Sequence, residues 1–132
     1  MKELIKLARE AKEKSYSPYS KFRVGAAVLM DDNEIYWGCN IENAAYTPTV
    51  CAERVAIFKG ISNGARYVKS IAIVADTSNT YPCGVCRQVI SEFANEDTKI
   101  IIANSEEDYR VYSFDEILPY SFGPMDLKKE KN

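Results

Sequence analysis

The chain has 132 residues, a length typical of one domain, and 46% of them are hydrophobic and 27% charged. These fractions match globular proteins and exclude a disordered or fibrous chain. The formal net charge of −2 excludes a generally basic protein that coats nucleic acid, although it leaves a local basic patch open. Because the sequence contains no histidine, any catalysis depends on cysteine, carboxylate, lysine, tyrosine or a metal. We expect residues 1–132 to form a single domain.

The N-terminal segment 1–6 mixes charged with apolar residues, which does not match the apolar core of a secretory signal. No apolar run approaches the roughly 18 residues that a membrane span requires. We therefore expect a cytoplasmic protein that does not act at a membrane. Cysteines in that compartment more often bind metal or take part in catalysis than form disulfides. The sequence has four of them, Cys39, Cys51, Cys83 and Cys86.

Apolar residues recur at helical spacing from Leu4 to Ala11 and predict an amphipathic helix that ends near Ser15. Pro18 then predicts a loop, because proline cannot continue a helix. Strands are expected over 24–30 and 35–40, joined as a hairpin by a turn at 31–33. The remaining predicted elements are a helix over 51–59 stopped by Gly60, a strand over 68–75, a helix over 84–93, strands over 99–103 and 109–114, a helical turn over 115–118, and a frayed tail over 128–132.

Strands that alternate with helices indicate a layered α/β fold. The two nearly continuous apolar runs, 68–75 and 99–103, are typical of strands covered on both faces. The hairpin makes the predicted sheet mixed rather than purely parallel. The cysteines of most interest lie at the starts of the two later helices.

Cys83 and Cys86 form a C-x-x-C element that opens a helix, so both thiols lie on one helix face. Cys51 opens the preceding helix. The positive end of a helix dipole favours a deprotonated, ligating thiol, and three thiolates plus a water are a catalytic zinc arrangement. A redox pair and half of a structural zinc site remain alternatives, and thiolates also accept iron. Cys39, in a predicted strand, is interpreted as a packing residue.

Glu53 follows Cys51 by two residues and so lies off the cysteine's helix face, beside an open coordination position. A carboxylate there is placed to move a proton of a metal-bound water. A solvated first-turn glutamate is the alternative interpretation. Arg54 follows Glu53 and Arg87 follows Cys86. Either arginine would offset the negative charge of a zinc–thiolate centre or simply lie at the surface.

The pattern C-x-E followed by P-C-x-x-C is a zinc deaminase signature, with cysteine here in place of the usual histidine. The blocks at 18–26, 40–46, 51–54, 82–88 and 118–124 closely resemble the small homotetrameric cytidine deaminases. The resemblance covers essentially the whole chain in the expected order. It implies a three-layer α-β-α sandwich with a mixed five-stranded sheet, one zinc ion per subunit held by Cys51, Cys83 and Cys86, and a homotetramer.

The resemblance further implies hydrolytic deamination of cytidine and deoxycytidine, in which a zinc-bound hydroxide attacks C4 of the pyrimidine. Glu53 would move the protons and ammonia would leave. Asn40 and Glu42 would bind the ribose hydroxyls, Phe22 would pack against the nucleoside, and backbone near Ala52 and Cys83 would read the base. Neighbouring subunits would complete each site through Tyr46 and Phe122, with Tyr19 as a weaker candidate.

Three other classes of protein fit parts of the pattern. A nucleic-acid editing deaminase shares the zinc core, but the acidic balance and compact length weigh against it. A blasticidin-type nucleoside deaminase shares the ligand set, and Phe22 with the block 40–43 favours cytidine instead. A non-enzymatic zinc-stabilised interaction module, or a degenerate deaminase kept for binding, is the third class, and the intact Glu53 argues against degeneracy.

Overall fold

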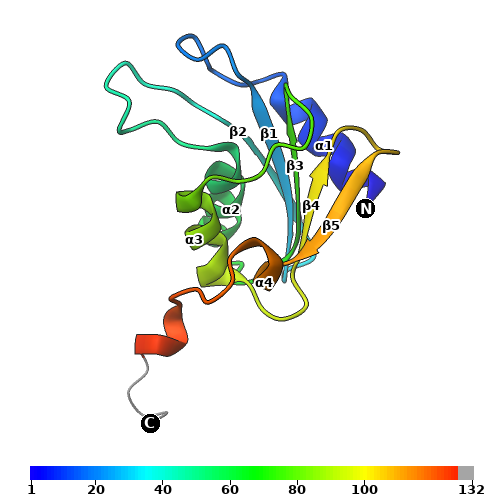
Figure 1. Ribbon diagram of the computed structural model, residues 1–132, viewed down its shortest axis with the longest axis vertical. Coiled ribbons are helices and arrows are strands. Elements are labelled where there is room, and N and C mark those ends of the chain that lie inside the picture. The colour runs from blue at the N-terminus through cyan, green and yellow to red at the C-terminus, as the bar shows by residue number, and fades with distance from the viewer. Residues whose placement is uncertain (128–132) are drawn as a thin grey trace.

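The computed structural model describes residues 1–127 and contains five strands, four α-helices and one 3-10 helix (Figure 1). The predicted tail 128–132 lies outside the described residues. None of the helices within residues 1–127 is long and apolar enough to cross a membrane. In chain order the elements are α1 (Lys2–Lys12), β1 (Val24–Met30), β2 (Ile35–Cys39), α2 (Ala52–Ser62), β3 (Val68–Ala75), α3 (Gly84–Phe93), β4 (Lys99–Ala103), β5 (Tyr109–Ser113), α4 (Phe114–Ile117) and η1 (Pro124–Leu127).

The five strands form one mixed sheet in the order β2-β1-β3-β4-β5. β3 and β4 pair in parallel, with Ile71 opposite Ile100, whereas β1–β2, β1–β3 and β4–β5 pair antiparallel. The predicted hairpin is β1–β2, with Ala26 opposite Gly38. The parallel pair needs a crossover, and α3 provides it.

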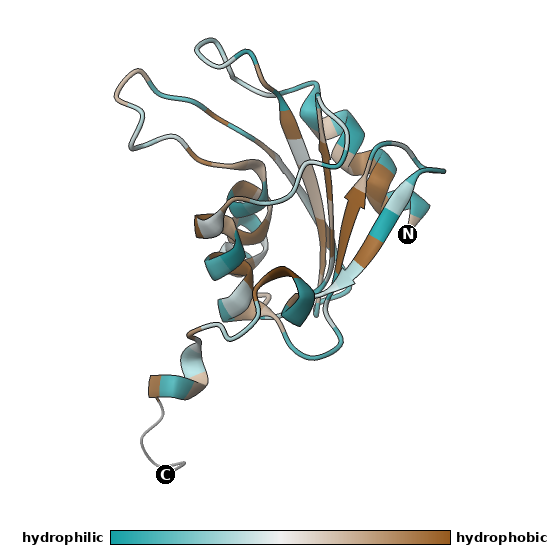
Figure 2. Cartoon of the chain, in the orientation of Figure 1, coloured by the Kyte–Doolittle hydropathy of each residue, from teal (hydrophilic) through white to brown (hydrophobic). Residues whose placement is uncertain are grey.

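Helices cover both faces of the sheet, which confirms the three-layer architecture (Figure 1). Alternate residues of β4 face opposite layers, because side chains along a strand alternate. Ile101 packs in the cluster under α1, whereas Ile100 and Ile102 pack in the cluster with α2, α3 and α4. Figure 2 shows the resulting hydrophobic colour along β4, which lies between β3 and β5. After the exposed Lys99, every residue of β4 is therefore apolar and buried, because each one faces a covering layer.

Glycines in the hairpin let the helices approach the sheet closely. A Cβ on Gly25 would lie 2.0 Å from the Ala8 carbonyl oxygen of α1. A Cβ on Gly38 would lie 2.6 Å from the Ala56 nitrogen of α2. No real Cβ tolerates these distances, so the two glycines set the spacing of the layers.

Several predicted helix limits are wrong. The first helix ends at Lys12 rather than near Ser15, because Ser15 and Tyr16 bond to Asn40 at the end of β2. Gly60 does not stop α2 but lies inside it, where the absence of a side chain makes room for Met30 and Tyr36 of the hairpin.

The chain reverses direction after α2 at Gly64, whose φ of +107° suits glycine. The last helical turn begins at Phe114, one residue earlier than predicted. Ser113 caps it, and the Glu116 side chain accepts a bond from the Ser113 N–H at 2.8 Å. β5 correspondingly ends at Ser113 and β2 ends at Cys39, each one residue before the predicted limit.

Candidate metal centre and substrate site

Three of the four cysteines converge at the starts of two helices. Cys51 and Cys83 are the N-cap residues of α2 and α3, and both have extended backbone conformations. In the described part of the chain neither thiol caps its helix, so both are free to face a common point. Cys86 lies in the first turn of α3 and is fully buried. Cys39 is separate from this group and donates its thiol to the Lys14 carbonyl at 3.3 Å.

The spacing of the three thiols fits a zinc ion. Their Sγ atoms all lie within 4.8 Å of one another, and the Cys51 and Cys83 Sγ atoms are 3.8 Å apart. With zinc–sulfur bonds of about 2.3 Å in tetrahedral geometry, two ligand sulfurs lie roughly 3.8 Å apart. Three soft sulfur donors favour zinc and leave a fourth position for a water or substrate. Cys51, Cys83 and Cys86 could therefore hold a catalytic type of metal ion.

Hydrogen bonds within the cluster already favour one thiolate. A bond from the Cys86 thiol, together with bonds from Arg54 and Cys83, lowers the pKa of Cys51 to about 5. The same bond and burial raise the pKa of Cys86, which keeps its proton. A metal ion would replace that proton, because ligating thiols are deprotonated.

Arg54 places positive charge against the sulfurs. Its Nη2 donates to Cys51 Sγ at 3.4 Å. Its Nε is buried and has no hydrogen-bond partner among residues 1–127. The guanidinium thus lies beside the cluster with one donor still unused, as suits a centre in which three thiolates bring excess negative charge.

Glu53 is the buried acid of this site, with only 4% of its surface exposed. Burial raises the pKa of Glu53 to about 7, and the negative charge of Cys51 acts in the same direction. A carboxyl group that titrates near neutrality both accepts and releases protons readily. Glu53 lies in the first turn of α2, two residues after the N-cap residue Cys51.

Arg87 has different partners from those predicted. Its Nε donates to the Pro82 carbonyl at 2.8 Å and its Nη1 to the Ile117 carbonyl at 2.6 Å. These bonds hold backbone rather than a ligand sulfur. No local pattern predicts the bond to Ile117, because this residue follows Arg87 by thirty positions.

A shallow cavity of about 370 Å³ brings together several predicted substrate residues. Glu42, Tyr46 and Tyr19 line it, together with Ser20 and Thr49. The two tyrosine rings meet edge to face, with centroids 6.3 Å apart. Tyr46 is nevertheless 72% exposed and has a left-handed backbone, with φ of 64°.

Glu42 is held by the loop opposite it. Its carboxylate accepts the backbone N–H groups of Tyr19 at 2.9 Å and Ser20 at 3.1 Å, and also the Ser20 hydroxyl. The bond from Ser20 lowers the pKa of Glu42, so the group stays ionised as an acceptor. Ser20 was not predicted as a site residue, because a serine in a proline-containing loop carries no signal of its own.

Asn40 is buried at the end of β2 and bonds to the start of β1. Its Nδ2 donates to the Phe22 carbonyl at 2.8 Å, and its Oδ1 accepts the Val24 N–H at 3.0 Å. Ser15, also missed in the sequence, donates its hydroxyl to the same oxygen. Asn40 therefore fixes the backbone that carries Phe22, and one amide hydrogen remains for a ligand.

The other predicted residues are more dispersed. Ala52 is fully buried behind Cys51, and Phe22 is partly buried before β1. Phe122 is 59% exposed on the C-terminal segment, where its carbonyl accepts Gln88 Nε2 at 2.8 Å. It does not line the cavity that holds Glu42.

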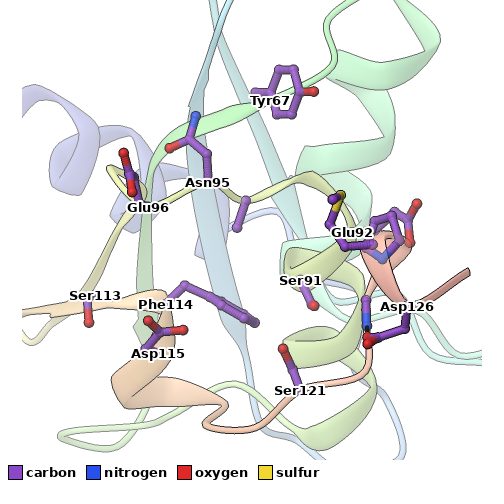
Figure 3. A pocket seen from close by; sticks show the side chains of 14 residues that line it. Tyr67, Ser91, Glu92, Asn95, Glu96, Ser113, Phe114, Asp115, Ser121 and Asp126 are labelled. Carbon is purple, nitrogen blue, oxygen red and sulfur yellow. Dashed lines mark hydrogen bonds between the residues drawn. The ribbon is translucent and has the colours of Figure 1, made fainter. Parts of the chain in front are cut away.

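A separate cavity of about 520 Å³ lies at the other end of α3 (Figure 3). Ser91 and Asn95 line it from the end of α3 and the loop after it, and Phe114 and Asp126 line it from the C-terminal part of the chain. None of the three clustered thiols lines this cavity. This cavity is larger than the one beside Glu42, and neither cavity is lined by the clustered thiols or by Glu53.

The path of the chain into Cys51 is set by a short bridge. Val50 and Ile41 exchange two backbone hydrogen bonds, each 2.9 Å long. This bridge joins the segment that carries Glu42 to the residue before Cys51. It places the cluster of three cysteines and the cavity beside Glu42 at the same end of the molecule.

The fold and the donor set indicate an α/β protein with a buried acid and a cluster of three cysteines that could hold a metal ion. Residues 1–103 match the family model described as cytidine and deoxycytidylate deaminase zinc-binding region, and the chain belongs to this family. It is 48% identical over 128 residues to the cytidine deaminase of Sporosarcina psychrophila. The aligned region covers 96% of this chain and 94% of that protein.

Two further comparisons agree. The chain is 49% identical over 125 residues to the cytidine deaminase of Halalkalibacterium halodurans, covering 94% of this chain and 95% of that protein. The crystal structure of cytidine deaminase from Burkholderia pseudomallei superposes with a TM-score of 0.85 at 41% identity, over 91% of this chain and 97% of that one. The expected family and fold are confirmed.

Proposed function

We propose that this protein, acting as a single catalytic domain over residues 1–132, hydrolyses cytidine and deoxycytidine to uridine and deoxyuridine with release of ammonia. The observation that carries the proposal is the convergence of three thiols beside buried Glu53. Family membership and relatives named as cytidine deaminases support it. A zinc ion held by the three cysteines would supply an activated water, because catalytic zinc lowers the pKa of bound water to about 7.

Glu53 performs the proton transfers in this proposal. It accepts a proton from the attacking water and delivers it to N3 of the pyrimidine. It then accepts the second proton from the hydroxyl formed at C4 and gives it to the amino group, which leaves as ammonia. Its pKa of about 7 suits both directions of transfer at neutral pH. Arg54 offsets the negative charge of the thiolates through its contact with Cys51.

The nucleoside binds between the loop before β1 and the loop after β2. Glu42 and the remaining amide hydrogen of Asn40 bind the sugar hydroxyls, since one offers an acceptor and the other a donor. Phe22 packs against the nucleoside. Backbone at Ala52 and Cys83 reads the base, because both lie at helix starts beside the cluster.

The test compares wild-type protein with Glu53→Gln, using the fall in ultraviolet absorbance of cytidine and the release of ammonia. Glu53→Gln should lose at least about three orders of magnitude in kcat, the usual span of a general acid–base group, and keep its zinc. Glu92→Gln, the same change at an exposed position of α3, is the control and should retain activity. Near-normal turnover by Glu53→Gln would overturn the proposed proton transfers.

A panel of substrates separates the alternatives. Cytidine and deoxycytidine should react, whereas single-stranded DNA or RNA containing cytosine should not. A reaction with blasticidin alone would assign the protein to the rival nucleoside deaminases. Zinc binding without any turnover would indicate a non-enzymatic module.

We also propose a homotetramer in which neighbours complete each site. Large apolar side chains of the C-terminal segment are exposed, including Tyr120, Phe122, Met125 and Leu127. Exposed aromatic residues of this kind are enriched at interfaces. Tyr46 is similarly exposed at the rim of the cavity beside Glu42.

Shared sites have a direct test in subunit mixing. Phe122→Ala and Glu53→Gln proteins should each be weakly active alone. After dissociation and reassembly together, some sites combine an intact Glu53 with an intact Phe122 from a neighbour, so activity should rise above the sum of the two. No rise in a mixture shown to contain mixed tetramers would refute shared sites.

We place the protein in the cytoplasm. All four cysteines are free thiols in the structure. A reducing compartment keeps clustered thiols available for metal rather than oxidised to a disulfide.

A further inference from the structure

We propose that Arg87 is a positioning residue for Cys83 and acts by fixing the backbone that presents this thiol to the metal. The inference rests on the proposed zinc ligation by Cys83. Arg87 joins two carbonyl groups, that of Pro82 at 2.8 Å and that of Ile117 at 2.6 Å. Pro82 directly precedes Cys83, so its carbonyl belongs to the peptide plane that enters the ligand residue.

Cys83 needs such support because the helix holds it weakly. It is the N-cap residue of α3, has an extended backbone with ψ of 170°, and is exposed. Its carbonyl accepts the Arg87 N–H at 2.9 Å, which ties its C-terminal side into the helix. The N-terminal side follows a proline, which has no N–H to anchor it. The side chain of Arg87 supplies the missing anchor.

The other end of the bridge lies in the C-terminal third of the chain. Ile117 is the last residue of α4, and its carbonyl lacks a continuing helix to satisfy it. A second link lies beside the first, because the hydroxyl groups of Tyr81 and Tyr112 are 2.6 Å apart. Their rings pack edge to face with centroids 5.6 Å apart. The segment that carries Cys83 is thus attached twice to the β5–α4 region.

Through these attachments, the β5–α4 region supports the backbone of the proposed metal ligand Cys83. The family model matches residues 1–103, which contain all three clustered cysteines. β5 and α4 lie beyond that range and contribute none of the three thiols. Through Arg87 and Tyr112 they brace the one exposed ligand of the cluster.

A charge effect of Arg87 on the sulfurs is the competing explanation. The geometry favours positioning, because the guanidinium donors point to carbonyls whereas Arg54 donates to Cys51. The planar guanidinium offers several donors in a fixed arrangement, but a lysine has a single nitrogen. Arg87→Lys therefore keeps the charge and loses the bridge, which separates the two explanations.

The primary test measures the rate at which zinc leaves the folded protein for a chromogenic chelator. Arg87→Lys and Arg87→Met should both release zinc at least about tenfold faster than wild type, the usual effect of removing a supporting contact. Arg66→Met is the matched control, because Arg66 also bridges two carbonyls, Ile61 at 3.0 Å and Ala65 at 2.7 Å, away from the cluster. It should change the rate less than about twofold even where it lowers Tm equally. Wild-type release from Arg87→Lys would overturn the proposal.

Cobalt substitution and a milder variant give independent results. The visible spectrum of the Co²⁺–thiolate centre should change in Arg87→Lys and stay unchanged in Arg66→Met. Tyr112→Phe removes one hydroxyl from a partly exposed pair, so it should fold and release zinc faster than wild type. Unchanged zinc release in Tyr112→Phe together with an unchanged cobalt spectrum in Arg87→Lys would refute the brace. Neither measurement uses a nucleoside, so failure of the proposed deamination would leave this test intact.

Discussion

Replacing Gly38 with alanine should destabilise the protein strongly and weaken the metal site as well. The added Cβ would lie 2.6 Å from the Ala56 nitrogen, 2.7 Å from the Ala52 carbonyl oxygen and 2.8 Å from the Val55 Cβ. Two of these atoms are backbone, so no side-chain rotation relieves the overlap. Relief requires α2 to move away from β2 by several tenths of an ångström. Because Ala52 follows Cys51 directly, that movement changes the position of a proposed ligand.

The cost of this substitution is at the upper end for overpacking, about 3 kcal/mol. For a chain of this size that corresponds to a fall in Tm of roughly 10 °C. Urea unfolding followed by circular dichroism measures the free energy of unfolding, and metal analysis measures the zinc content. Gly25→Ala is the comparison, because its Cβ would strike Ala8 of α1 on the opposite face. It should also destabilise the fold but should not reduce zinc content in the folded fraction. A Gly38→Ala protein within 1 kcal/mol of wild type would refute the close-packing argument.

Two further substitutions test the cluster and the ion pairs. Cys86→Ser should weaken zinc binding by more than about 100-fold and lower stability in the presence of zinc, and normal zinc stoichiometry at low zinc concentration would exclude Cys86 as a ligand. Hydrogen bonds from Arg23, with a further bond from Lys12, hold the pKa of Asp76 at about 2, below the ordinary 3.8. Since this folded-state pKa is lowered, its stabilisation is complete above about pH 5 and disappears as the pH falls toward 2. Wild type should exceed Asp76→Asn by about 1 kcal/mol at pH 6 and lose that advantage at pH 2, as denaturant unfolding at both pH values would show.

Local sequence signals predicted the elements that depend on neighbouring residues. The cysteines at 51 and 83 stand where helices begin, and a helix start is visible from a proline or a change of periodicity. The apolar runs at β3 and β4 were sufficient to predict buried strands, because every position of such a strand faces a covering layer. These predictions required no knowledge of distant contacts.

Contacts between distant residues explain the predictions that were wrong or incomplete. Gly60 was assigned as a helix stop because glycine commonly follows helices, but Met30 and Tyr36 of the hairpin require its small size. Arg87 was predicted either to offset the charge of the cluster or to lie at the surface, but its side chain bonds to the carbonyl of Ile117 on α4. The one-dimensional pattern does not encode which carbonyl remains unsatisfied at the end of a short helix.

Because the chain has no histidine, a metal site built from its cysteines carries excess negative charge. The fold compensates for this charge in two ways. Three thiolates around a divalent cation leave one net negative charge, which opposes the release of a proton from bound water. The first compensation comes from the fold itself, since both α2 and α3 direct their positive ends at the cluster. The second comes from Arg54, which donates to Cys51 and retains an unused buried Nε. A Cys51→His variant would remove one negative charge, so the same arginine would then lower zinc affinity rather than raise it. Adding Arg54→Gln should therefore weaken zinc binding in the wild-type background and not in Cys51→His. Equal losses in both backgrounds, measured by chelator competition, would show that Arg54 acts by packing and not by charge.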